Sequence, residues 1–251
     1  MLFRVLLGID LALLALIFLS DAAVTLYIRG HPDGDLARQV SAAAAASDRS
    51  SGLLQSALLV LFGGGLLPAV FLAFSRNKPW PGVVRALRLH RPGPSIALGI
   101  GMGVAVLFAL GIVISIGLSV YAQLTHQDLK AVQDQNTSQA AQDLIRLTPL
   151  PLALLLSLSA GVGEEVLFRG LLQRWFSRFG SWTGVVVPAG LFGLLHYGYG
   201  TPLQILGPML LGLVFGFLIL RGFSLWVTIA AHATFDFAVF VIQRLFGDLG
   251  F

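Results

Sequence analysis

Long apolar stretches separated by short polar segments run through the whole chain. A helix needs about 20 mostly apolar residues to cross the hydrocarbon core of a bilayer. The stretches that approach or exceed this length are Leu2–Tyr27, Gly52–Phe74, Ser95–Ala122, Leu150–Ser177, Trp182–His196, Pro202–Leu220 and Ser224–Phe246. The pattern predicts an all-α, polytopic transmembrane helix bundle of about seven helices.

Composition supports the same class. Of the 251 residues, 56% are hydrophobic and only 11% are charged, whereas a soluble domain carries about 25% charged residues. The chain has no cysteine, which excludes disulfides, thiolate metal sites and thiol nucleophiles. The net charge of +4 does not indicate nucleic-acid binding, because basic residues in a membrane protein mainly report its topology.

The distribution of basic residues predicts the orientation. The loop that follows the second apolar stretch contains five cations and no acid, namely Arg76, Lys78, Arg85, Arg88 and Arg91. Such loops stay in the cytoplasm, and alternation then places the N-terminus there too. The first stretch is interrupted by Asp10 and lacks a good cleavage site, so we expect a retained helix rather than a signal peptide.

Two regions are predicted along the chain. Residues 1–147 would hold three helices and their loops, and residues 148–251 would hold four helices. Gly99, Gly101 and Gly103 lie within the third apolar stretch. Glycines in an apolar helix favour close helix packing, and we expect that role for all three.

Strongly polar residues are rare inside the last four predicted helices. They are Glu164, Glu165, Arg169, His196, His232 and Asp236. Their depth below the cytoplasmic face can be counted from the turns at Gly180 and Gly222, at about 1.5 Å per residue. This depth is about 24 Å for Glu164, about 22 Å for His196, about 15 Å for His232 and about 21 Å for Asp236. Residues from three helices therefore fall near one level of the membrane.

The spacing within each helix agrees with this depth. Glu165 and Arg169 are four residues apart, as are His232 and Asp236, so each pair shares a helix face. Phe192 has the same relation to His196 and is expected to pack beside the imidazole. Any one of these groups alone is best explained as structural, as a buried ion pair or a hydrogen-bonded histidine. Together they predict a polar cavity between the last four helices, with groups suited to acid–base or metal chemistry.

Three short motifs at these residues resemble a known family. They are "EEVLFR" at Glu164–Arg169, "FGLLH" at Phe192–His196 and "HATFD" at His232–Asp236. In this order they are similar to the EExxxR, FxxxH and Hxxx(N/D) signatures of the CAAX-protease and bacteriocin-processing (Abi) family. The resemblance covers about Leu150 to Phe246 and implies an intramembrane endopeptidase. It also implies a peptide or lipidated-protein substrate, of a prenylated or bacteriocin type.

Two mechanisms fit these residues, and the first is the one that the resemblance implies. In one, Glu164 and His196 activate a water, and His232 and Asp236 stabilise the oxyanion without a metal. Glu165 would then be supported by Arg169. In the other, His196, His232 and Asp236 hold a zinc ion, since two histidines and one carboxylate are a known catalytic zinc set. Asp236 stands where the prenyl-protein enzymes have Asn, and an ionised Asp can only accept hydrogen bonds. No cofactor is therefore certain from the sequence.

Two other functions are compatible with the pattern. A transporter also gathers polar groups near mid-membrane, but it usually shows repeated halves, which are not evident here. A non-catalytic immunity or scaffold protein could keep the same fold. In every case the lipid bilayer is the expected partner, with no nucleic acid, and composition favours a bacterial inner membrane.

Overall fold

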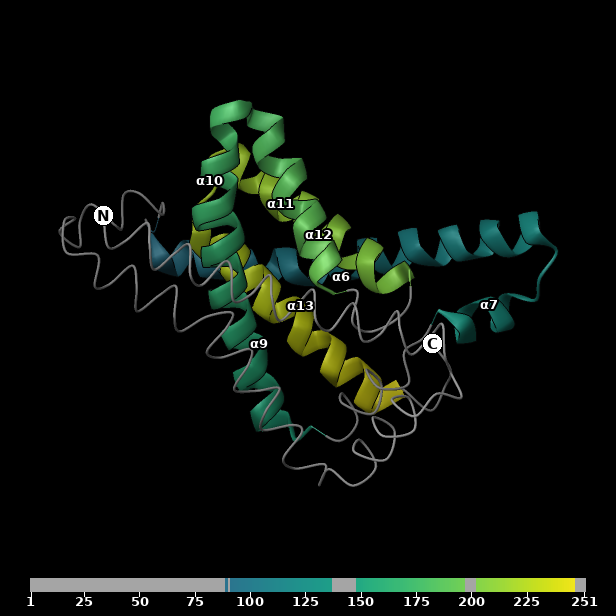
Figure 1. The fold of residues 1–251 in the computed structure, drawn as a ribbon. Coiled ribbons are helices and arrows are strands. Elements are labelled where there is room, and N and C mark those ends of the chain that lie inside the picture. The colour runs from purple at the N-terminus through teal and green to yellow at the C-terminus, as the bar shows by residue number, and fades with distance from the viewer. Residues whose placement is uncertain (1–88, 90, 137–147, 197–201, 247–251) are drawn as a thin grey trace, which may run out of the picture. The chain divides into compact units, whose positions relative to one another are not determined.

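The computed structural model describes residues 89, 91–136, 148–196 and 202–246 of the chain (Figure 1). All of them lie in one compact unit, Val60–Phe251. The predicted helices Leu2–Tyr27 and Gly52–Phe74 lie outside the described residues, so the number of helices stays a prediction.

The described residues are almost entirely helical and contain no strand, which confirms the predicted all-α class. The helices are α6 (Pro92–Thr125), α7 (Leu129–Gln135), α9 (Leu150–Glu165), α10 (Gln173–Phe176), α11 (Ser181–Leu195), α12 (Pro202–Leu220) and α13 (Leu225–Phe246). Between α9 and α10 lies a π-helical segment, η2 (Val166–Leu172), and a 3₁₀ turn, η3 (Ser177–Phe179), follows α10.

Local sequence explains where these helices begin and end. Pro92 and Pro151 occupy first-turn positions of α6 and α9, where the missing proline N–H has no helical partner to lose. Gly180 separates η3 from α11 with a φ of 137°, a conformation that side chains with a Cβ rarely adopt. Asp128 caps α7 by accepting hydrogen bonds from two backbone N–H groups.

Among the described residues, three helical stretches are long and apolar enough to cross a membrane. They are Pro92–Thr125, Leu150–Phe179 and Leu225–Phe246. The predicted spans Trp182–His196 and Pro202–Leu220 form shorter apolar helices, which contain Pro188 and Pro208. The chain is thus an integral membrane protein. Its predicted orientation and bacterial origin stay predictions.

Helix α13 packs against both α6 and α9, while α11 and α12 pack mainly on each other. Glycines make the contacts of α13 very close. A Cβ placed on Gly99 or Gly103 of α6 would lie 2.5 Å from a backbone oxygen of α13, and one on Gly161 of α9 would lie 2.8 Å from another. The predicted role of Gly101 is not seen in the described part of the chain, where a Cβ on this residue would meet no atom within 4 Å.

Candidate active site

His232 is the centre of a cluster of three carboxylates. It lies on α13 and is buried, with 3% of its surface exposed. Its Nδ1 is 2.9 Å from Glu165 Oε1, at the end of α9. An ionised carboxylate can only accept, so this contact places a proton on Nδ1. The Nε2 edge of the ring therefore faces the rest of the site.

One side of the cluster is closed. Arg169 Nη1 lies 3.0 Å from Glu165 Oε1, and the two side chains are 2% and 0% exposed. The guanidinium carbon also stands 4.9 Å from the ring centre of Phe192 and 5.6 Å from that of Phe215. Glu165 Oε2 accepts no hydrogen bond from the described residues. The buried charge of Glu165 thus depends on Arg169 and His232.

The other side of the cluster is open. Glu164 Oε2 lies 3.7 Å from His232 Nε2, and Asp236 Oδ2 lies 3.5 Å from the same nitrogen. Their side chains are 22% and 27% exposed, whereas that of Glu165 is inaccessible. Glu164 and Asp236 therefore keep accessible surface and Glu165 has none, although Glu164 and Glu165 are neighbours in sequence.

The π-helical segment η2 begins directly after the two glutamates and contains Arg169. A π-turn holds one more residue than an α-turn and often marks a functional site. Here it follows the point where Glu164 and Glu165 turn to the two nitrogens of one imidazole. Nothing in the sequence indicated this segment, because "VLFRGLL" is compatible with an ordinary α-helix.

His196 lies at the end of α11 and is partly buried. Its Nδ1 is 2.8 Å from the carbonyl oxygen of Phe192. A carbonyl can only accept, so Nδ1 carries a proton and, in the neutral ring, Nε2 holds the lone pair.

Phe192 joins the two histidines. Its ring centre lies 4.9 Å from that of His196 and 5.8 Å from that of His232, and both contacts are edge-on. Phe192 is 1% exposed, so it packs beside the imidazole as expected. Phe168 and Phe215, which also line the site, were not singled out from the sequence. Apolar residues in apolar helices carry no distinguishing signal.

The structure thus brings Glu164, Glu165, His232 and Asp236 together. His196 is linked to this cluster through the ring of Phe192, which contacts both histidines. The sequence also offered His196, His232 and Asp236 as a zinc-binding set. Among the described residues, no group of three or more His, Asp or Glu side chains is arranged to hold a metal ion. His232 Nδ1 is engaged by Glu165, so Nε2 is the ring nitrogen that faces Glu164 and Asp236. The zinc set stays a prediction, and the proposed reaction uses the side chains alone.

Comparison with known proteins points to one family. No curated protein and no solved structure matches the chain. Residues 146–238, however, match the sequence model of a family described as "Type II CAAX prenyl endopeptidase Rce1-like". The matched range includes all three motifs and ends two residues after Asp236. The resemblance read from those motifs is therefore confirmed over residues 146–238, which are similar to the Rce1-like type II CAAX prenyl endopeptidase family.

Proposed function

We propose that the chain is an intramembrane endopeptidase that hydrolyses a peptide bond in a lipidated or membrane-associated substrate, with water activated by Glu164 and His196. The observation that carries this proposal is the contrast between the two adjacent glutamates. Glu164 is 22% exposed and faces His232 Nε2, while Glu165 is inaccessible and holds His232 Nδ1. This contrast supports Glu164 as the carboxylate that meets the attacking water and Glu165 as the one that orients the imidazole.

The first step is attack by water on the scissile carbonyl carbon. Glu164 and His196 together act as the general base. One of them accepts the proton from water as the new C–O bond forms. His196 is suited to this role because its neutral ring presents Nε2 as an acceptor. A positioned general base typically adds about 10²- to 10⁴-fold to the rate.

The second task is to stabilise the negative oxygen of the tetrahedral intermediate. His232 does so by donating from Nε2, while Glu165 keeps the proton on Nδ1. Asp236, 3.5 Å from Nε2, favours the protonated imidazole by its negative charge. When the C–N bond breaks, the base returns its proton to the leaving amine. The products are a carboxylate and a free amine.

The test is peptide cleavage by the full chain reconstituted in liposomes. The substrates are prenylated C-terminal peptides together with unmodified membrane-associated peptides. Glu164→Gln and His196→Gln should each lower kcat at least about 100-fold while the protein stays folded. Asp134→Asn is the matched control, since Asp134 is an exposed acid on α7. It should cleave at the wild-type rate.

Full activity in both Glu164→Gln and His196→Gln would disprove the proposed base. No cleavage by the wild type across the substrates would favour the alternative of a non-catalytic immunity or scaffold protein. Uptake of solute into the same liposomes without cleavage would favour a transporter. The family match supports a peptidase with a peptide substrate in general, which is why cleavage is tested first.

A further inference from the structure

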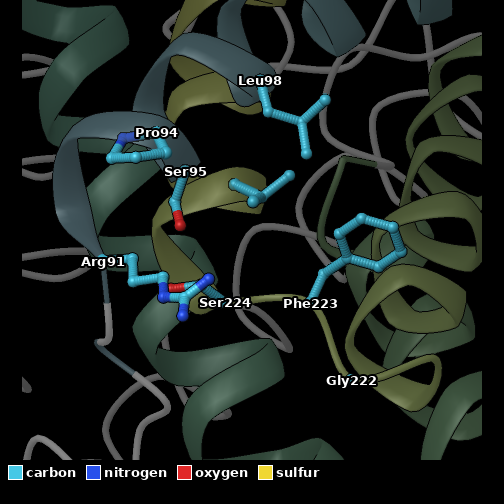
Figure 2. A pocket seen from close by; sticks show the side chains of 8 residues that line it. Arg91, Pro94, Ser95, Leu98, Gly222, Phe223 and Ser224 are labelled. Carbon is cyan, nitrogen blue, oxygen red and sulfur yellow. The ribbon is translucent and has the colours of Figure 1, made fainter.

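A second polar pocket lies apart from the glutamate–histidine cluster. It lies between the start of α6 and the turn that joins α12 to α13, with a volume of about 440 Å³. Figure 2 shows Arg91, Ser95 and Leu98 around one hollow with Phe223 and Ser224. None of the six polar motif residues contributes to its lining, so the proposed peptidase reaction does not use it.

The pocket has one polar end and one apolar side. Arg91 is exposed at the polar end, where Ser95 and Ser224 also contribute to the wall. The described residues that line the pocket include no acid, so its charge is positive. On the apolar side, Leu98 is 47% exposed and belongs to the outward face of α6. The pocket therefore opens toward the surface that would face lipid chains.

The position of the pocket matches the edge of the hydrocarbon layer. Two candidate membrane spans, Pro92–Thr125 and Leu225–Phe246, both begin beside it. Arg221 precedes the pocket residue Gly222, and its guanidinium lies 5.7 Å from the ring centre of Phe217. Phe217 in turn stacks on Trp182, which is 61% exposed. Exposed tryptophan and arginine at one end of a helix bundle are typical of the membrane–water interface.

We propose that this pocket binds the phosphate headgroup of an anionic phospholipid, with Arg91 as the cation that holds the phosphate. Arginine matches the geometry of a phosphate oxygen pair, and the serine wall suits the polar headgroup. The apolar side next to Leu98 lets the acyl chains run along the outer face of α6. A soluble phosphate ester could satisfy Arg91 but would leave this apolar side in water.

The experiment measures lipid retention by the full chain in detergent, using native mass spectrometry. The probes are dioleoyl phosphatidylglycerol, dioleoyl phosphatidylcholine and soluble glycerol 3-phosphate. The wild type should retain phosphatidylglycerol in preference to phosphatidylcholine, and glycerol 3-phosphate at equal concentration should not displace it. Arg91→Asn should weaken phosphatidylglycerol binding about fivefold, the effect of one interfacial basic residue. Asn is chosen because it tolerates the left-handed φ of 48° at this position.

Two further variants separate the site from general surface charge. Arg91→Lys keeps the positive charge but loses the paired donors of the guanidinium, so its binding should lie between those of wild type and Arg91→Asn. Arg178→Asn removes another exposed arginine, one that stacks on Trp175 and does not line the pocket, and it should change binding less than about twofold. Thermal unfolding of each variant shows that it is folded. Equal phosphatidylglycerol retention by wild type and Arg91→Asn would overturn the proposal, as would displacement by glycerol 3-phosphate.

Discussion

The ion pair between Glu165 and Arg169 offers the sharpest test of how the site is held together. We consider Arg169→Met, which removes the guanidinium but keeps an unbranched apolar side chain among the surrounding rings. Glu165 is 0% exposed and its Oε2 accepts no hydrogen bond from the described residues. The substitution therefore leaves a buried carboxylate with His232 as its one polar contact among those residues.

The size of the effect follows from these contacts. Breaking a buried ion pair by removing one partner costs about 3–5 kcal/mol. Contact with the His232 N–H at 2.9 Å remains, and a hydrogen bond to a charged group contributes about 1.5–3 kcal/mol. Methionine also keeps favourable contacts with the rings of Phe192 and Phe215. We therefore expect a loss at the lower end of the range, about 3 kcal/mol in the free energy of unfolding.

The assay is reversible unfolding of the purified protein in mixed micelles, followed by circular dichroism. Arg178→Met is the matched control. It removes a guanidinium that also stacks on aromatic rings, 4.4 Å from the centre of Trp175 and 5.5 Å from that of Phe179. Arg178 is exposed, so its loss should cost less than about 1 kcal/mol.

A double variant tests the cause. Glu165→Gln combined with Arg169→Met removes the buried charge together with its partner, so it should be more stable than Arg169→Met alone. If Arg169→Met and Arg178→Met differ by less than about 0.5 kcal/mol, the pair does not support the fold as described. The same conclusion follows if the double variant is no more stable than the single one.

Three further predictions follow from the contacts. Gly99→Leu should destabilise the fold by at least about 2 kcal/mol, because its Cβ would meet the α13 backbone. Gly101→Ala should instead stabilise the fold by up to about 1 kcal/mol. Unfolding curves compare the two variants, and equal effects on the free energy of unfolding would contradict the described packing. Gln173→Leu should cost about 1 kcal/mol through loss of the 2.8 Å bond to the Gly216 carbonyl, with kcat unchanged. Peptidase activity should survive a divalent-metal chelator, and loss of activity that zinc restores would favour the metal mechanism.

The sequence was sufficient to predict the long apolar helices of the described part of the chain, but not the short helix α7 (Leu129–Gln135). The expected spans Pro202–Leu220 and Ser224–Phe246 agree with α12 and α13 to within one residue. This success has a simple cause, since a helix is the regular way for a single segment to satisfy its backbone in lipid. The depth count also placed Glu164 and Asp236 near one level, and both lie within 3.7 Å of His232 Nε2.

Side-chain pairing was harder to predict. Helical spacing paired Glu165 with Arg169 and His232 with Asp236, and both pairs are present. It could not indicate that Glu165 also contacts His232, 67 positions away, because that contact depends on how α9 and α13 pack. The π-helical segment η2 was also missed, because π-turns are rare and its residues are compatible with an ordinary α-helix.

The glycine contacts of α13 bear on how a substrate enters. Gly99, Gly103 and Gly161 bring the backbones of α6 and α9 against this helix, so α13 cannot shift sideways without a collision. His232 and Asp236 are therefore fixed in position, as a pre-organised reaction centre requires. Helices α11 and α12 pack mainly on each other, and α12 packs only lightly on α13. We therefore expect a substrate that enters from the bilayer to displace α11 and α12 rather than α13, and His196 to move with α11.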